Sequence, residues 1–460
     1  MTPYKSLALL ALALATAGPV GGCKADILGA TDPDIILEAN SASGALALKN
    51  GVLLRLAQAL NGVQGPDAFF VYSGLVTDEW RSGDTFVQRN NQDQRIWEPT
   101  NTFNADPYRR LNRVRVEGLA AIKALRQYVA DSVYLVGRMF ALTGYVETLI
   151  GENYCNGTPL SGLDGTTIVY GQPLSNDSVL ALAIQNADSA LAQAALAPPR
   201  DSIQSRRVTR LASVVKGRAL MDRGQFAAAA AAVAGVPDTF RYQITHSVNA
   251  NTNQIFALNN SARRYTMVDS EGVVGLDFIS ANDPRLPRAT GTNSSTDLIF
   301  DSAYPLFVTR QGIWTSTAPV SIVTGIEARL IEAEAELQTG GNTATWLTII
   351  NTLRTNTALY PAAQSGFTRG PNLTAIADTF ASNTSRMKTN FRERAFWMFS
   401  TGHRLGDMRR MVRQYAYPAD SIYPRGGYYK GGTFGTALML PVPFEEVNNP
   451  NFTQCTNLDP

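Results

Sequence analysis

The densest group of charged side chains in this sequence lies near its C-terminus, where acid–base chemistry is the first possibility to consider. Its members are Arg392, Glu393, Arg394, His403, Arg404, Asp407 and Arg409. Helical spacing places Arg404 and Asp407 on one face, and Glu393 is positioned to pair with Arg404 across a turn. Catalysis would also need a nucleophile and a pocket, and the sequence indicates neither. We therefore predict that Glu393, Arg404 and Asp407 form a structural ion network.

Histidine and cysteine are too scarce for the common catalytic and metal-binding arrangements. The chain has 2 His, His246 and His403, and 3 Cys. A Ser-His-Asp or Cys-His site would need one of these His, and neither has a partner at local spacing. The His and Cys residues also lack the ligand spacing of a zinc site. A carboxylate pair for glycoside hydrolysis stays open, because such a pair needs no sequence motif. We expect no metal and no cofactor.

The aromatic residues are better suited to ligand binding. Rings interspersed with Asn, Asp and Arg occur in two long polar segments, as Tyr72, Trp80, Trp97 and Phe103 in the first and Tyr304 and Trp314 in the second. An aromatic ring offers a large contact area with little conformational freedom to lose. It stacks on a sugar ring while neighbouring polar groups bond the hydroxyls. The alternative for each single ring is that it fastens a loop to the core. We predict that at least one of these rings contacts a ligand.

The first residues have the pattern of a lipoprotein export signal. Lys5 precedes an apolar run over residues 7–17, which is shorter than the roughly 20 residues needed to span a bilayer and typical of a signal peptide. Two glycines directly before Cys23 leave room for the processing enzyme. We predict a signal peptide over 1–22, a lipid on Cys23 and a tether over 23–40. A secreted protein with an incidental Cys23 is the alternative. The Lys and acidic residues of the tether resemble tags of surface lipoproteins.

Two further predictions follow from cysteine content and charge. With Cys23 lipidated, Cys155 and Cys455 remain, and an exported chain meets an oxidising compartment, which favours a disulfide between them. The alternative is two free thiols that lie too far apart. Basic and acidic residues nearly balance, at 40 against 38, and no basic cluster stands out. Nucleic acid is therefore not expected as a partner.

Hydrophobic periodicity predicts a mostly helical protein. Helices are expected over 42–60, 108–129, 132–152, 179–196, 206–222, 225–234, 320–338, 343–355 and 389–415. Short turns containing glycine join 206–222 to 225–234 and 320–338 to 343–355, which is typical of helical hairpins. Long loops are expected over 62–106, 239–319, 360–371 and 417–436. The pattern predicts irregular tetratricopeptide-like hairpins forming a scaffold, with long loops and a few short strands.

Several segments, in order along the chain, resemble motifs of the SusD/RagB family of outer-membrane nutrient-binding lipoproteins. They are VGRMFALTGYVETLIGENYCNGTPLS from Val136, VTRLASVVKGRALMDRGQFAAAAAAV from Val208, IVTGIEARLIEAEAELQTG from Ile322, TIINTLRTN from Thr348, FRERAFWMFSTGHRLGDMRRM from Phe391 and LMLPVPFEEVNNPNFTQ from Leu438. The sequence departs from the family at Thr401, where Glu is usual, and at Gly406, where an aromatic residue is frequent. The resemblance covers nearly the whole mature chain.

The resemblance implies a fold and a function. It implies one body over 41–460, with an N-terminal part over 41–200 and a C-terminal part over 201–460. It also implies an outward-facing lipoprotein of the outer membrane that binds glycan or peptide nutrients, performs no chemistry, and passes them to a TonB-dependent SusC-type transporter. The alternatives are a helical-repeat lipoprotein that assembles other envelope proteins, which would need no long aromatic loops, and a lipid-anchored hydrolase, which the resemblance disfavours.

Overall fold

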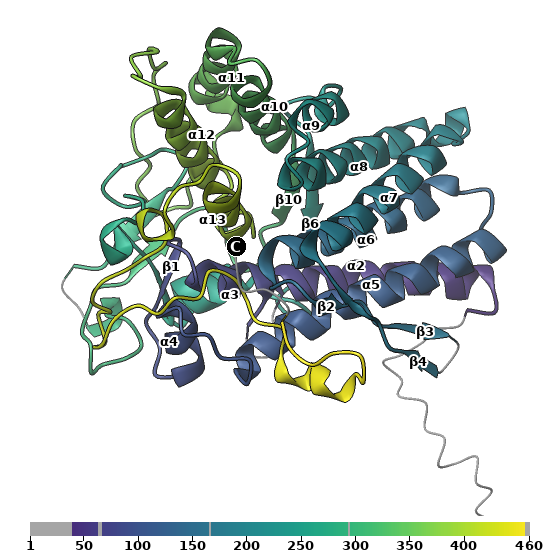
Figure 1. Cartoon of the computed structure of the whole chain (residues 1–460), viewed down its shortest axis with the longest axis horizontal. Coiled ribbons are helices and arrows are strands. Elements are labelled where there is room, and N and C mark those ends of the chain that lie inside the picture. Colours follow the sequence, from purple (N-terminus) through teal and green to yellow (C-terminus); the bar gives the residue numbers. More distant parts are fainter. Residues whose placement is uncertain (1–38, 63–66, 165–166, 293–294, 456–460) are drawn as a thin grey trace, which may run out of the picture.

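The structure is a computed structural model that describes residues 39–62, 67–164, 167–292 and 295–455. The predicted signal peptide 1–22, Cys23 and nearly all of the tether 23–40 lie outside the described residues. The described part is mainly helical, with short two-stranded pairings between loops (Figure 1). This confirms the predicted fold class of helical hairpins, long loops and a few short strands.

Five long helices form a layer at the right of Figure 1. They are α2 (Ala42–Asn61), α5 (Thr102–Tyr128), α6 (Val133–Asn153), α7 (Asn176–Ala195) and α8 (Ser202–Asp222). Side-chain caps mark the start of α2, α5 and α7; in α7 the Ser175 hydroxyl accepts a hydrogen bond from the Ser178 N–H at 3.1 Å. By length and composition α6 is apolar enough to cross a bilayer, but 78% of its most apolar stretch is buried in the protein. That burial identifies α6 as the central helix of the layer.

Five further helices lie above and to the left of this layer in Figure 1. They are α9 (Phe226–Val233), α10 (Gly325–Thr339), α11 (Thr343–Thr355), α12 (Asn383–Trp397) and α13 (Arg404–Arg413). α8 and α9 form one hairpin, whose turn contains Gly224 with a φ of 71°. α10 and α11 form the second. Both hairpins were expected from the sequence.

The helix predicted to begin at residue 320 begins at Gly325, because the preceding residues form a strand. This strand, β10 (Val320–Thr324), pairs antiparallel with β6 (Arg241–Ile244). Four of its five residues are buried and β-branched, which suits a strand. The Thr324 hydroxyl then accepts a hydrogen bond from the Glu327 N–H at 3.0 Å, which caps α10.

The helical block expected over 389–415 is divided into α12 and α13. The break contains Ser400 and Gly402, whose φ angles are 54° and 74°. Gly402 lies against the rings of Phe69 and Phe70, and a Cβ there would come within 2.9 Å of the Phe70 ring. Only glycine satisfies both the left-handed backbone and this close approach. The break turns α13 toward the layer of long helices.

The long loops contain short elements of their own, mostly at the left of Figure 1. They include α3 (Phe69–Leu75), α4 (Val87–Asp93) and a π-helical turn over Phe256–Ser261. β1 (Trp80–Ser82) pairs with β7 (Tyr265–Met267), and β8 (Arg288–Thr290) pairs with β9 (Thr309–Gln311). Elsewhere β2 (Thr158–Pro159) pairs with β5 (Pro173–Leu174), and β3 (Gly162–Asp164) with β4 (Thr167–Val169). Single 3₁₀ turns span Pro199–Asp201, Glu271–Val273, Ser295–Asp297, Thr357–Leu359, Ala419–Ser421 and Phe444–Asn448.

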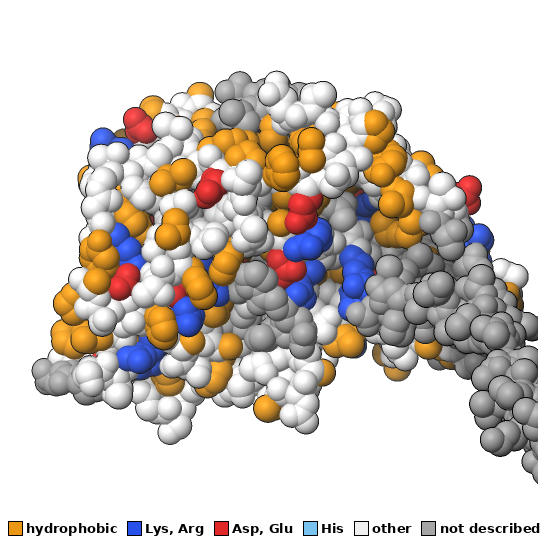
Figure 2. Space-filling model, turned by 90° about the horizontal axis from the view of Figure 1, so that it is seen from below, with side chains coloured by type: hydrophobic (Ala, Val, Ile, Leu, Met, Phe, Trp, Pro, Cys, Tyr) orange, Lys and Arg blue, Asp and Glu red, His pale blue; other side chains and the backbone are white. Residues whose placement is uncertain are grey.

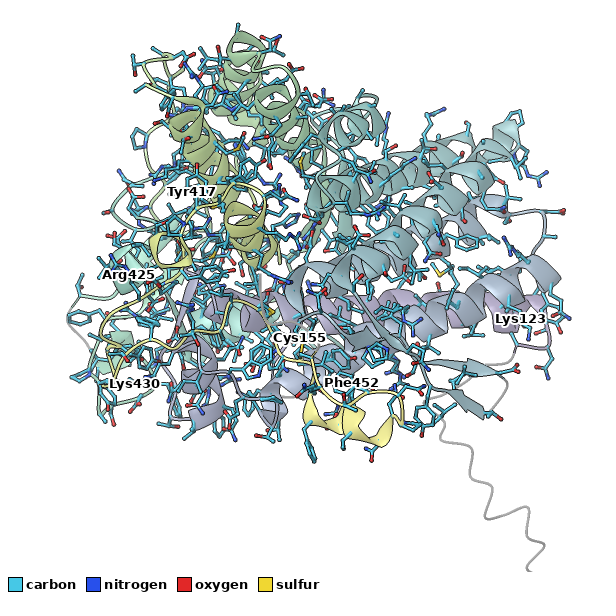
Figure 3. The ribbon with its side chains drawn as sticks, in the orientation of Figure 1. Lys123, Cys155, Tyr417, Arg425, Lys430 and Phe452 are labelled. Carbon is cyan, nitrogen blue, oxygen red and sulfur yellow. A yellow bond between two sulfur atoms is a disulfide. The ribbon has the colours of Figure 1, made fainter. Side chains whose placement is uncertain are left out.

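A disulfide joins Cys155, just after α6, to Cys455 near the C-terminus. The two Cα atoms are 5.9 Å apart although 300 residues separate them in sequence. Figure 3 labels Cys155 at the end of α6 and Phe452 on the nearby C-terminal segment. The bond therefore ties the end of the chain to the central helix of the layer.

We predict that the double variant Cys155→Ser/Cys455→Ser unfolds at a lower urea concentration than the wild type. In the chain-entropy model, a disulfide that closes a loop of this length raises the free energy of unfolding by up to about 6 kcal/mol. Reduction of the wild type before unfolding is the control, because it opens the same loop without changing a buried residue. Equal midpoints for the oxidised and reduced wild type would contradict the prediction.

Candidate functional site

The charged side chains of α13 are buried and paired with several distant segments. Arg404, Asp407, Arg409 and Arg410 are each at most 6% exposed. Asp407 pairs with Arg394 of α12 at 3.0 Å and with Arg410 at 2.7 Å. A buried charge without such partners would be strongly destabilising. The arrangement is therefore that of a structural network.

The expected pair between Glu393 and Arg404 is wrong. Arg404 instead donates two hydrogen bonds to the Asp78 carboxylate, at 2.7 and 2.8 Å. Glu393 pairs with Arg285 at 2.6 Å and also with Arg354. The physical reason is the break between α12 and α13, which turns Arg404 away from Glu393. Spacing along a single continuous helix could not anticipate this geometry.

A cavity of about 530 Å³ lies beside this network. Its walls come from β6, β10, the loop before β10, the segment 358–362 and the end of α12, together with the break that follows it. The aromatic residues that line it are Trp314, Tyr360, Phe396, Trp397 and Phe399. Its volume lies in the range of small-molecule sites, and such sites combine apolar walls with a few polar groups. This cavity, called the aromatic pocket below, is the candidate functional site.

Trp314 is held in place by a buried glutamine. The Gln311 side chain accepts hydrogen bonds from the backbone N–H groups of Ile313 at 2.7 Å and Trp314 at 2.8 Å. Its amide donates to the Trp314 carbonyl at 2.9 Å and to Asn260 Oδ1 at 2.7 Å. Because Gln311 is fully buried, these bonds fix the backbone of the loop. The half-buried Trp314 ring is thus presented from a rigid support.

Tyr360 and Trp397 form another part of the pocket wall. Their ring centroids are 5.6 Å apart and their planes are tilted by 45°. The Arg285 guanidinium lies 5.1 Å from the Trp397 ring and 5.1 Å from the Phe396 ring, distances typical of cation–π contacts. Arg285 is itself fixed by Asp283 at 2.6 Å. These contacts keep both rings at defined positions.

Polar groups occupy the strand side and the floor of the aromatic pocket. Arg241 and Gln243 lie two residues apart on β6, and the Gln243 amide donates to the Ser321 hydroxyl of β10 at 3.3 Å. His403 lies at the floor, 3.1 Å from Glu327. Burial lowers the pKa of His403, and the positive charge of Arg218 lowers it further. His403 is therefore largely neutral at pH 7.

Two of the aromatic residues expected to contact ligand are core residues. Tyr72 and Trp80 are both fully buried, so the expectation of ligand contact is wrong for them. The Trp80 indole N–H donates to the Ser400 hydroxyl at 2.8 Å, and its ring packs 5.2 Å from Phe399. Trp80 thus fastens β1 to the break between α12 and α13. This matches the alternative role of holding a loop to the core.

The other expected residues separate into three places. Trp314 lines the aromatic pocket, and Trp97 is half-buried and packs on the core. Phe103 and Tyr304 belong to a second aromatic group at the loop end of the molecule, where Phe103 lies 5.5 Å from Phe86 and Tyr304 lies 5.9 Å from Tyr429. Both are half-buried. Among the candidates, only Trp314 lines the pocket.

The second group, called the loop-end cluster, is partly open to solvent. Phe86 is 45% exposed and Phe300 is 41% exposed, and the Arg264 guanidinium lies between them, 5.1 Å and 3.9 Å from their rings. Figure 3 labels Lys430 at this end and Lys123 of α5 at the opposite end. Viewed from below, hydrophobic side chains alternate with basic ones toward the left, where the loops lie (Figure 2). The exposed rings place this cluster at the surface.

Sequence reasoning missed Tyr360, Trp397 and Arg241. Trp397 lies inside a helix in the charged block, so its aromatic ring was overlooked beside the ionisable groups. Tyr360 opens a loop predicted from 360 to 371, which is the one signal that could have indicated it. Arg241 is an isolated residue in a long loop and carries no local motif. In the described part of the chain no cluster of three His, Cys, Asp or Glu residues has a metal-binding arrangement.

Comparison with family models finds no match, and comparison with curated proteins finds none either. Solved structures do match. A SusD-like carbohydrate-binding protein from Bacteroides fragilis NCTC 9343 is 13% identical, with a TM-score of 0.63 over 90% of this chain and 99% of that one. A SusD/RagB family protein from Bacteroides thetaiotaomicron VPI-5482 is 14% identical, with a TM-score of 0.61 over 88% and 94%.

A third similar structure is a SusD-like carbohydrate-binding protein from Bacteroides vulgatus ATCC 8482. It is 15% identical, with a TM-score of 0.59 over 90% of this chain and 97% of that one. These matches extend over nearly the whole length of both chains. The protein therefore has the SusD/RagB fold.

We predict a pH-dependent effect of Glu79→Gln on stability. Glu79 is 1% exposed, burial raises its pKa to about 8, and the charge of Asp78 contributes to the rise. Because the folded pKa lies above the ordinary value of 4.5, the wild type loses stability as pH rises from 4.5 toward 8. Gln has no proton to lose. The free energy of unfolding of the variant should therefore rise relative to that of the wild type by roughly 1.4 kcal/mol per pH unit in this range.

Urea unfolding of both proteins at pH 5 and pH 8 measures this difference. The variant keeps a carbonyl oxygen to accept the hydrogen bond that Ser400 N–H donates to Glu79 at 2.7 Å. A difference in unfolding free energy that stays constant between the two pH values would show that Glu79 does not titrate as stated.

Proposed function

We propose that this chain is a SusD/RagB-type lipoprotein that binds nutrient glycans in the aromatic pocket and delivers them to a transporter. In this proposal Cys23 carries the lipid and anchors the protein to the outer face of the outer membrane. The partner is a TonB-dependent SusC-type transporter. The chain captures and releases its ligand and catalyses no reaction.

The observation that carries the proposal is the composition and support of the aromatic pocket. Trp314, Tyr360 and Trp397 line the cavity with aromatic side chains, and Arg241, Gln243 and Ser321 bring hydrogen-bonding groups to the same cavity. Rings supply contact area and the polar groups supply specificity. Rigid supports, such as Gln311 behind Trp314, reduce the entropy lost on binding. The descriptions of two similar structures as carbohydrate-binding agree with this assignment.

The combination of pocket and fold also distinguishes the proposal from its rivals. A pure scaffold has no need for a supported aromatic cavity of this size. A hydrolase needs groups that transfer protons to and from a bound substrate. His403 and Glu327 are the ionisable pair at the floor, and both are almost fully buried and paired with each other and with Arg218. Their contacts suit a structural role.

Binding variants test the site. We predict that Trp314→Ala and Tyr360→Ala each weaken glycan binding at least about tenfold, as expected for aromatic anchors in a binding site. A glycan array probed with the detergent-solubilised full chain identifies the ligand, and calorimetry then measures the affinities. Phe300→Ala, which removes an exposed ring from the loop-end cluster, is the matched control. Loss of binding in Phe300→Ala with full binding in the pocket variants would move the site to the loop-end cluster.

Purification from native membranes tests the partner and the anchor. We predict that tagged wild-type chain enters the detergent phase and co-purifies with a large β-barrel protein. Cys23→Ala should leave the detergent phase, because it lacks the acyl chains that give stable attachment. Recovery of the wild type alone, or with periplasmic proteins, would contradict transporter partnership. Equal partitioning of the variant would contradict lipidation.

A further inference from the structure

The charged residues that line the aromatic pocket differ in whether they have a partner of opposite charge. The charged residues that line it are Arg241, Arg285 and Glu327, with His403 at the floor. Arg285 is balanced by Asp283 and Glu393, each at 2.6 Å. Glu327 faces Arg218 at 3.9 Å and His403 at 3.1 Å. Among the described residues, Arg241 is the one lining charge with no carboxylate partner.

Arg241 is also partly removed from water. Its side chain is half-buried, and burial lowers its pKa from the ordinary value of 12.5. The one hydrogen bond that its side chain makes to the described residues is a long contact of 3.4 Å to the Leu359 carbonyl. A guanidinium keeps its charge at neutral pH even so. Because the Arg241 guanidinium is partly desolvated and has no carboxylate partner, its planar set of N–H donors is available to bind a carboxylate.

The neighbours of Arg241 determine what kind of molecule would bring that carboxylate. Gln243 and Ser321 lie on the same strand pair and offer amide and hydroxyl groups. The aromatic side chains of Trp314 and Tyr360 line the same cavity. A sugar ring that carries a carboxylate matches all three features, because it has an apolar face, hydroxyls and a negative charge within one residue.

We propose that the aromatic pocket selects acidic glycans, with Arg241 pairing to the carboxylate of a uronic acid residue. This inference rests on the proposed glycan-binding function and adds the class of glycan. Gln243 and Ser321 bond the hydroxyls of the same sugar, and the aromatic rings contact its apolar face. Neutral glycans leave Arg241 unpaired and bind more weakly.

A matched pair of ligands tests the charge directly. The probes are galacturonate and glucuronate oligosaccharides and the methyl esters of the same oligosaccharides, which keep the rings and hydroxyls but remove the charge. We predict that the wild-type full chain binds one of the acids at least about tenfold more tightly than its ester. The preference should shrink as salt is raised, since salt screens the exposed part of the interaction.

Three variants distinguish a specific role of Arg241 from an effect of overall positive charge and from a loss of folding. Arg241→Gln should remove the preference for acid over ester while leaving ester binding within about twofold, because the ester never pairs with the guanidinium. Arg241→Lys should retain part of the preference. Arg207→Gln is the control, because Arg207 is exposed and stacks on Tyr242 at 5.2 Å, outside the pocket lining. Thermal unfolding confirms that each variant folds.

The outcomes distinguish failure of this inference from failure of the proposed function. Equal binding of acids and esters, or equal binding of neutral oligosaccharides, overturns the acidic class and leaves glycan binding intact. An acid preference that survives in Arg241→Gln assigns the charge recognition to another residue. Binding of peptides with a free carboxylate, without binding of any oligosaccharide, overturns both the class and the proposed glycan function.

Discussion

The buried charges of α13 are the constraint on which the rest of the structure depends. Each of these side chains lies where water does not reach it, so each requires a partner of opposite charge or a polar backbone group. The partners come from segments far apart in sequence: Asp78 from the first long loop, Asp222 from the end of α8, and Glu334 from α10. Arg409 donates to the carbonyl of Tyr154 at the C-terminal end of α6. These contacts hold α13 against elements that lie far apart in the sequence.

The same constraint positions the aromatic pocket. The end of α12 and the break after it form one wall, and their course is set on one side by the network and on the other by Gly402 against Phe69 and Phe70. The opposite wall is the pair β6 and β10, which leads directly into α10 and its network residues Glu327 and Glu334. The pocket therefore lies between two rigid elements. Its side chains are supported before any ligand arrives, which reduces the entropic cost of binding.

Helix periodicity predicted most of the helices well, because apolar residues that recur every 3.6 positions form one continuous face of a helix that packs on the core. It failed at residues 320–324, where the strand β10 reads as an apolar extension of α10, and at the break after Trp397, which depends on contacts with Phe69 and Phe70. Both errors concern tertiary contacts that a local pattern does not contain. The same limit explains the ion pairs. The sequence indicated that Glu393, Arg404 and Asp407 belong to a network, but their partners lie up to 326 residues away.

The site likewise depends on tertiary contacts that the local sequence does not contain. Of the expected aromatic residues, Trp314 lines the pocket and Trp80 serves the core, and their local sequences do not differ in any way that predicts this. Their tertiary contacts distinguish them. Trp80 packs against the break after α12, whereas Trp314 lies at the pocket on a loop held by Gln311. Solved structures of 13% and 15% identity share the fold, so most side chains can differ while the fold is kept. In the proposed function the class of glycan depends on a few side chains such as Arg241, so it follows from the pocket and not from the fold.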